Sequence, residues 1–380
     1  MQDEASVVII GAGIIGSSIA YSLAKRGVTD VVLLDSSKAG SGSTSAALGG
    51  FRYQFSNELS IRLSQESIRT IENFRELTGY DPLVKHDGYV FIASTENSLS
   101  QLKRNAELAV SMGVPVDLLS HEDLQKRFSY YRFDGILGGT ACMLDGHAST
   151  FAVHQGFISK AKEMGVSLYE DTAVTGISRT ESVVKGVATA RGDIRTKKVV
   201  IASGAYSGVV GNLAGVEIPI RPQPRKILVT HPFIDGIPLD APIIIDVDST
   251  LAIGREGKGV IFADNSTSTP GFDLVFPPDY DERIISSAIK RIPSLANATI
   301  SYSDVGLYEL SPDSNPIVCE IPEVEGLYCC SGFAGHGFMH SPAIGELTAE
   351  LLTGSKPHLD ISSFSIERFK GTTLDEGLII

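Results

Sequence analysis

The sequence predicts an α/β domain with a parallel sheet, interleaved with a second, α+β domain whose sheet is mainly antiparallel. Three observations predict this class. First, an apolar run at residues 7–10 leads through glycines into a helical pattern at residues 14–26 and a second apolar run at residues 31–34. Second, apolar runs at residues 198–204 and 326–331 would add strands to the same sheet. Third, short strands follow one another beyond a proline-rich stretch, which is typical of antiparallel pairing.

The first unit carries the pattern of a dinucleotide site. Gly11, Gly13 and Gly16 form G-x-G-x-x-G between a strand and a helix. The first glycine allows a tight turn, the second lets a pyrophosphate approach the backbone, and the third lets the helix pack on the strand. Asp35 ends the second strand, where a carboxylate can accept both hydroxyls of an adenosine ribose. Because Lys38 is the only cation nearby, a 2′-phosphorylated nucleotide is disfavoured. This unit alone leaves NAD and FAD open.

Composition excludes several other classes. The 380 residues suit two domains, and the net charge of −13 disfavours nucleic acid and anionic membranes as partners. Apolar stretches stay below the roughly 18 residues of a transmembrane helix, and the acidic N-terminus does not resemble a secretory signal. We therefore expect a cytoplasmic protein without an integral membrane segment. The four cysteines lack zinc-like spacing, so no metal is expected, and Cys329 and Cys330 are expected to be reduced thiols in a buried strand.

The remaining elements follow from spacing and turn chemistry. A loop of small residues at 39–50 would let its backbone approach a ligand closely. Ser120 and Asp123 predict a capping box. We expect further helices at residues 60–77, 98–112, 151–164, 283–291 and 343–352. We expect further strands at residues 89–93, 167–169, 198–204, 227–230, 243–245, 259–262, 315–318 and 326–331.

The prolines at residues 219–224 mark a crossing between the two domains. Each predicted domain is therefore built from separated stretches of the chain. The nucleotide-binding domain would comprise residues 1–86, 144–220 and 313–380. The other domain would comprise residues 87–143 and 221–312.

Three segments together resemble the flavin-dependent amine oxidoreductases of the D-amino-acid oxidase superfamily. They are residues 11–16 with 39–45, residues 306–316 (GLYELSPDSNP) and residues 332–342 (GFAGHGFMHSP). The last is specific to the branch that holds sarcosine oxidase β-type subunits, dye-linked L-proline dehydrogenase and glycine oxidase, and it favours FAD over NAD. The resemblance implies a Rossmann-like, glutathione-reductase-like FAD-binding domain beside a substrate domain.

The resemblance also implies an extended FAD and the residues that hold it. A helix N-terminus at the pyrimidine edge of the flavin would stabilise the negative charge that reduction brings there. The implied cofactor-binding residues are Gly11, Gly13, Ile14, Ile15, Gly16, Asp35, Ser36, Ser43, Thr44, Ser45, Gly49, Gly50, Val174, Gly204, Gly335, His336, Gly337, Phe338 and Met339.

We expect the FAD to be noncovalent. One branch of the superfamily links its flavin to a cysteine just before the Leu-Tyr of the second motif, where this chain has Gly306. Others use a histidine near residues 147–154. His147 and His154 lie in that stretch, but neither aligns with the linking position.

Three residues form the predicted catalytic set. Arg52 follows the small-residue loop and is the candidate for a substrate carboxylate, because a guanidinium binds one with two parallel hydrogen bonds. The alternative is a surface arginine paired with Glu58 or Glu66. Tyr308 would help to bind the carboxylate or pack against the flavin. His336 would orient the flavin or shape the pocket, or it is a turn histidine bonded to backbone.

Two positions depart from the relatives in ways that weaken the carboxylate site. Monomeric sarcosine oxidases have a lysine where this chain has Met339, and glycine oxidase has an arginine where this chain has Tyr308. Carboxylate binding would therefore rest on Arg52, with help from Tyr308 or from residues that the sequence does not identify.

The resemblance implies oxidation of the C–N bond of a small, secondary amino acid such as proline or sarcosine, or of glycine, with hydrolysis of the imine product. Ile261 occupies the strand position where oxidases of the superfamily keep a lysine, while Lys258 would point elsewhere. This favours a dehydrogenase that passes electrons to a carrier over an oxidase that uses O₂.

Two alternatives remain. The chain could be the FAD-bearing subunit of a hetero-oligomeric dehydrogenase, docked on an α-type partner, rather than a homo-oligomer. It could also be a 2-hydroxyacid or glycerol-3-phosphate oxidoreductase, although Arg52 and Arg225 offer few cations for a phosphate.

Overall fold

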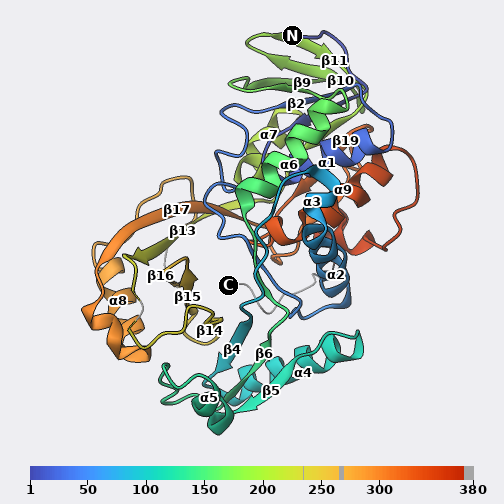
Figure 1. The fold of residues 1–380 in the computed structure, drawn as a ribbon. Coiled ribbons are helices and arrows are strands. Elements are labelled where there is room, and N and C mark those ends of the chain that lie inside the picture. Colours follow the sequence, from blue (N-terminus) through green and yellow to red (C-terminus); the bar gives the residue numbers. More distant parts are fainter. Residues whose placement is uncertain (234, 265–268, 372–380) are drawn as a thin grey trace.

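The computed structural model describes residues 1–233, 235–264 and 269–371. The chain forms two lobes (Figure 1), each built on its own large sheet. In the described residues no helix is both long and apolar enough to cross a membrane, and no cluster of three or more potential metal ligands is found.

The first lobe contains a six-stranded sheet in which five neighbouring strands run parallel and only β18 is antiparallel. Its strands are short runs of β-branched and other apolar residues that are buried on both faces, as a central parallel sheet requires. This confirms the predicted parallel sheet. In sheet order the strands are β18 (Ile317–Glu320), β19 (Leu327–Ser331), β12 (Val199–Ile201), β1 (Val7–Ile10), β2 (Val31–Leu34) and β8 (Ser167–Tyr169).

Different layers cover the two faces of this sheet. One core cluster joins Ile9 and Leu33 to helices α1 (Ile14–Lys25), α2 (Glu58–Glu72), α6 (Thr150–Glu163) and α9 (Gly337–Leu352). The other cluster joins Val8 and Val32 to a three-stranded antiparallel sheet and helix α7 (Ser207–Leu213). That small sheet consists of β11 (Gly192–Arg195), β10 (Val183–Thr189) and β9 (Val174–Thr180).

The second lobe is built on an eight-stranded sheet that is antiparallel except where β14 pairs with β4. This confirms the mainly antiparallel sheet. In order the strands are β17 (Ile300–Leu310), β13 (Arg221–Thr230), β16 (Gly259–Asp264), β15 (Leu251–Glu256), β14 (Ile243–Asp246), β4 (Tyr89–Ala93), β6 (Gly138–Cys142) and β5 (Asp117–Ser120). Its helices are α4 (Glu96–Ser111), α5 (His121–Arg127) and α8 (Tyr280–Arg291).

Within the described residues, two sets of strands connect the lobes. The long strands β13 and β17 reach from the second lobe to the short helix η1 (Gly204–Tyr206) of the first (Figure 1). The two-stranded sheet of β3 (Gly50–Phe51) and β7 (Gly146–His147) lies beside the start of β4. The exact domain boundaries stay a prediction.

Several element predictions hold and others need correction. The Ser120–Asp123 capping box forms, and Cys329 and Cys330 are free and buried in β19. The helix predicted at 60–77 is interrupted at Asn73, which separates α2 from α3 (Phe74–Thr78). The small sheet β9–β11 and strands β5, β6 and β15 were not predicted, because their apolar alternation is short or mixed with polar residues.

The helix predicted to begin at residue 343 instead begins at Gly337. Proline normally disrupts a helix interior because it has no N–H to donate, and Pro342 lies inside α9. The carbonyl of Phe338, which that missing N–H would have met, accepts a hydrogen bond from the hydroxyl of Ser341 at 2.9 Å. The hydroxyl satisfies the orphaned carbonyl, so the helix continues through the proline.

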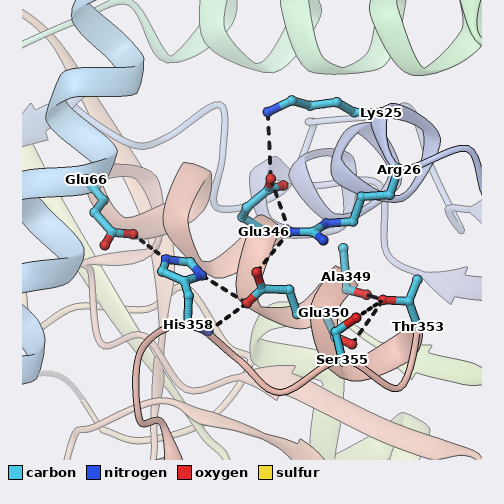
Figure 2. Close-up of polar contacts among 9 residues, drawn as sticks. All are labelled: Lys25, Arg26, Glu66, Glu346, Ala349, Glu350, Thr353, Ser355 and His358. Atoms are coloured by element: carbon cyan, nitrogen blue, oxygen red, sulfur yellow. Dashed lines mark hydrogen bonds and ion pairs between the residues drawn. The ribbon is translucent and has the colours of Figure 1, made fainter.

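Ion pairs tie the C-terminal half of α9 to α1 and α2 (Figure 2). Arg26 lies 2.9 Å from Glu350 and 3.3 Å from Glu346. The Nδ1 atom of His358 lies 2.9 Å from Glu350, and its Nε2 atom lies 2.8 Å from Glu66 on α2. His358 therefore joins α9 to α2 through two carboxylates.

This arrangement predicts a pH-dependent contribution of His358 to stability. Partial burial lowers the pKa of His358, but its hydrogen bonds to Glu66 and Glu350 outweigh this and raise it overall. The contribution is therefore fully present below the unfolded pKa of about 6.5 and is lost as pH rises through the folded pKa. Because the ring is partly exposed, we expect H358Q to lower the free energy of unfolding by only about 0.2–1 kcal/mol at mildly acidic pH.

The measurement is urea unfolding of both proteins on each side of that range. The difference should be larger at about pH 6 than at about pH 8.5. H231Q, at an exposed histidine, serves as the control. A difference that grows toward alkaline pH would contradict the assignment.

Candidate functional site

The turn between β1 and α1 has the backbone geometry of a diphosphate cradle. Gly11 has φ +109°, and a side chain there would strike the carbonyl of Ala202. A side chain on Gly16 would strike the carbonyl of Gly11, so this glycine lets the helix lie close to the turn. The space over Gly13 is open except for Thr44 Oγ1, 3.2 Å from the point where a Cβ would lie. Since the first turn of α1 has no acidic residue, its positive end can receive an anion.

Asp35 stands at the carboxyl end of β2 with its carboxylate already oriented. One oxygen accepts the N–H of Ala12 at 2.8 Å and the other accepts the N–H of Ser37 at 2.9 Å. Burial raises the pKa of Asp35, and these two hydrogen bonds oppose that rise. Each carboxylate oxygen keeps a second lone pair for a ribose hydroxyl. The backbone N–H of Thr172 bonds to the carbonyl of Asp35 at 2.7 Å, which brings the start of β9, and thus Val174, toward the same end.

The small-residue loop is fixed by its own polar groups. Thr44 Oγ1 accepts the N–H of Ile14 at 2.9 Å. The hydroxyls of Ser43 and Ser45 donate to the carbonyls of Leu307 and Gly42, at 2.7 and 2.9 Å. These hydroxyl hydrogens are therefore used within the protein, and the serines shape the loop. Their contact with a cofactor stays a prediction, as it does for the exposed Ser36.

His154 anchors the same loop, a role that the sequence did not indicate. Its Nε2 atom donates to the carbonyl of Ala12 at 2.8 Å, and its ring lies against Gly40. Burial lowers the pKa of His154. The neutral ring, protonated at Nε2, thus joins α6 to the glycine turn.

A second glycine-rich turn, residues 332–336, precedes α9. Gly332 and Gly335 have φ +88°, and Ala334 has φ +50°, which is unfavourable for a residue with a side chain. A side chain on Gly335 would come within 2.6 Å of the ring of Tyr308, so this tyrosine packs directly on the turn. The first turn of α9 has no acidic residue. The turn thus presents an open, positive helix end, while Phe338 and Met339 are buried in the core.

Arg52 is buried between the lobes, with only 3% of its surface exposed. Its guanidinium lies 4.2 Å from the ring centre of Phe55 and 5.3 Å from that of Phe91. It donates to the carbonyl of Gln54 and lies 2.9 Å from Nε2 of His336. The alternative of a surface arginine is therefore wrong, and Glu66 pairs with His358 instead.

The contact with Arg52 fixes the protonation state of His336. Burial and the nearby charge of Arg52 hold the pKa of His336 well below its usual value, so the ring is neutral. A guanidinium can only donate, so Nε2 of His336 accepts and the ring proton lies on Nδ1. His340 is likewise buried, with its pKa lowered to about 3, and lies 3.0 Å from Ser64 Oγ. The ring of Phe55 lies 5.1 Å from each imidazole.

A buried carboxylate behind Arg52 could not be identified from the sequence. Asp145 is 0% exposed and accepts the backbone N–H of Tyr53 at 2.7 Å and the side-chain amide of Gln54 at 2.9 Å. Burial raises the pKa of Asp145 to about 7, against the opposing effects of these bonds and of Arg52. Asp145 therefore fixes the positions of Tyr53 and Gln54, the two residues that follow Arg52. In the sequence it resembles an ordinary turn residue, 93 positions from Arg52.

A small cavity of about 50 Å³ lies between β3–β7 and β14–β16. Gly50, Tyr89, Ile243 and Ile261 line it together with charged residues at its rim. A side chain on Gly50 would strike the hydroxyl of Tyr89. Ile261 is buried here, and Lys258 is exposed in the turn before it. That Ile261 faces a flavin stays a prediction.

The structure thus brings the three predicted catalytic residues to one region. Arg52 contacts His336 directly, and Tyr308 packs on Gly335 beside it. A Cβ on Gly204, the first residue of η1 after β12, would lie 3.5 Å from a carboxylate oxygen of Glu309. Arg225, whose guanidinium lies 5.2 Å from the ring centre of Tyr308, is a further cation in this region.

Comparison with known proteins identifies the family. Residues 6–351 match the family described as FAD dependent oxidoreductase (DAO). The chain is similar to 4-methylaminobutanoate oxidase (formaldehyde-forming) of Paenarthrobacter nicotinovorans, with 26% identity over 96% of this chain and 45% of the relative. It is 28% identical to mitochondrial sarcosine dehydrogenase of Mus musculus over 99% of this chain and 42% of the relative. The chain spans less than half the length of these two relatives.

Solved structures agree with this placement. L-proline dehydrogenase from P. horikoshii superposes with a TM-score of 0.91 at 31% identity, over 98% of this chain and 100% of that one. Glycine oxidase from Geobacillus kaustophilus superposes with a TM-score of 0.85 at 26% identity, over 97% and 99%. The open glycine turn, the oriented Asp35 and the positive end of α9 fit the diphosphate, the ribose and the flavin of an FAD.

Proposed function

Because the chain belongs to the family of FAD dependent oxidoreductases, we propose that it oxidises the C–N bond of a small amino acid, with proline, sarcosine and glycine as candidates. The observation that carries this proposal is the buried Arg52 held by the neutral His336. A guanidinium in a fixed orientation suits a planar carboxylate. L-proline dehydrogenase and sarcosine dehydrogenase among the similar proteins support an amino acid with a secondary amine.

Bound FAD supplies the acceptor for a hydride equivalent from the carbon next to the amine. The chain's own residues bind and orient the substrate. Arg52 would hold its carboxylate, and the ring of Tyr308, which is packed against Gly335, would form a wall of the site. Exclusion of water by the surrounding rings favours the neutral amine, which is the form that can be oxidised. Release of the product into water then allows the imine to hydrolyse.

The direct test is anaerobic titration of the FAD-loaded protein with a panel of compounds. We expect a secondary amino acid to bleach the flavin. L-Lactate and glycerol 3-phosphate represent the alternative substrates, and bleaching by these alone would overturn the proposal. Size-exclusion chromatography of the active sample would then decide between a lone chain, a homo-oligomer and a need for an α-type partner.

We predict that FAD is bound without a covalent link. Gly306 takes the place of the linking cysteine, and a side chain there would come within 2.9 Å of Ala46. Acid or heat should therefore release all of the flavin into the supernatant. Yellow colour that stays with the precipitated polypeptide would contradict this.

R52A should weaken substrate binding far more than FAD binding. Loss of a hydrogen bond to a charged group typically costs about 1.5–3 kcal/mol, so KM should rise roughly ten- to more than a hundredfold. Steady-state kinetics with the best substrate measure this, and the flavin spectrum reports whether the cofactor site is intact. A change in KM below about twofold would move the carboxylate anchor to another residue.

The electron acceptor is predicted to be a carrier, with Ile261 in place of the lysine of oxidases. Transfer to O₂ forms superoxide first, and a fixed positive charge near the flavin lowers that barrier. Substrate-reduced protein should therefore reoxidise slowly in aerated buffer and quickly with an artificial dye. I261K should speed the reaction with air, provided that the buried ammonium stays charged against desolvation. Stopped-flow mixing measures the rate of reoxidation of both proteins. Fast reoxidation of the unmodified protein by air would identify an oxidase.

A further inference from the structure

The turn at residues 332–336 lies on the last part of β17. Two neighbouring residues of this strand, Tyr308 and Glu309, contact it from two sides. On one side, the ring of Tyr308 fills the space that a side chain on Gly335 would need. On the other side, the neighbouring Glu309 bonds to the turn through both its main chain and its side chain. Its carbonyl accepts the N–H of Ala334 at 3.2 Å, and its carboxylate accepts the N–H of Phe333 at 3.4 Å.

The carboxylate of Glu309 also holds the strand that feeds this turn. It accepts the hydroxyl of Ser331, the last residue of β19, at 2.7 Å. Ser331 in turn lies 2.7 Å from the hydroxyl of Ser207 on α7 and 3.1 Å from the carbonyl of Gly204. The side chain of Glu309, on the eight-stranded sheet, therefore binds the loop after β19 directly and is linked through Ser331 to the loop after β12, beside the predicted flavin site.

The turn needs such support because its backbone is strained. Three of its residues, Gly332, Ala334 and Gly335, have positive φ, and Ala334 carries a Cβ that disfavours this conformation. Strain of this kind persists only where surrounding contacts fix it. Two of these contacts are the hydrogen bonds donated by the N–H groups of Phe333 and Ala334, and Glu309 accepts both.

The turn ends in His336, whose Nε2 atom lies 2.9 Å from Arg52. We propose that Glu309 is a positioning residue: it holds the turn that places the first residues of α9 and His336, and through His336 it sets the orientation of Arg52. Its effect on the substrate rests on the proposed function, whereas its effect on FAD binding rests only on the family. In this role Glu309 would act through hydrogen-bond acceptance, without itself contacting substrate or flavin.

The test compares E309A and E309Q with E350Q as the matched control. Glu350 is a carboxylate on the other half of α9, 8% exposed, that also ties its helix to neighbouring elements. FAD affinity is measured by fluorescence titration of the apoprotein, and KM and kcat are measured with the substrate that bleaches the flavin. Thermal unfolding reports general loss of stability.

We expect E309A to raise both the dissociation constant of FAD and KM by about tenfold or more, because small displacements of binding groups have large effects. E309Q keeps a carbonyl oxygen for the turn and should stay within about threefold of the unmodified protein. E350Q should lower the melting temperature while leaving KM unchanged. An E309A protein with unchanged FAD affinity and KM, or an E350Q protein with the same rise in KM, would overturn the proposal.

Two further outcomes are also decisive. If E309A does not fold, S331A is tested in its place, because this change removes the hydroxyl that donates a hydrogen bond to Glu309. KM should then rise by about threefold with kcat little changed, and an unchanged KM overturns the proposal. If no amino acid bleaches the flavin, the proposed function fails but the FAD titration still decides the role of Glu309.

Discussion

The burial of the Arg52 guanidinium between the two lobes is the constraint that organises this molecule. Removing a charge from water is costly unless its surroundings replace the lost hydration. Here the rings of Phe55 and Phe91, the carbonyl of Gln54 and a neutral imidazole surround the cation. These groups come from the first lobe, from β4 of the second lobe and from the turn before α9. The cation can hold its orientation only when both lobes and that turn are in place.

The support for this arrangement extends outward in layers. Asp145 fixes the segment that carries Tyr53 and Gln54, and the amide oxygen of Gln54 accepts the hydroxyl of Thr140 on β6 at 2.8 Å. Glu309 fixes the turn before α9, whereas the ion pairs of His358 and Arg26 act at the far end of that helix and stabilise the fold rather than the site. Each layer uses polar groups that are far apart in sequence. Such networks favour one geometry of the site over alternatives, because every partner that is removed leaves a buried group unsatisfied.

The sequence predicted the features that depend on local chemistry. The glycines at 11, 13 and 16 and the β-branched strands beside them each follow from the backbone of a nucleotide-binding turn. The roles of Asp145, His154 and Glu309 could not be predicted, because their partners lie more than twenty residues away and only tertiary folding brings them together. The start of α9 was misplaced for a related reason. Pro342 argues against a helix unless it is known that the Ser341 hydroxyl satisfies the carbonyl left without a donor.

The central claim is that Arg52 recognises the carboxylate of an amino-acid substrate. It is tested most directly by comparing the amino acid that bleaches the flavin fastest with its carboxamide, under anaerobic conditions and with the same protein. We expect the carboxamide to reduce the flavin with an efficiency lower by about a hundredfold, and R52A to remove most of this difference. Equal efficiency of the two compounds with the unmodified protein would contradict this role of Arg52.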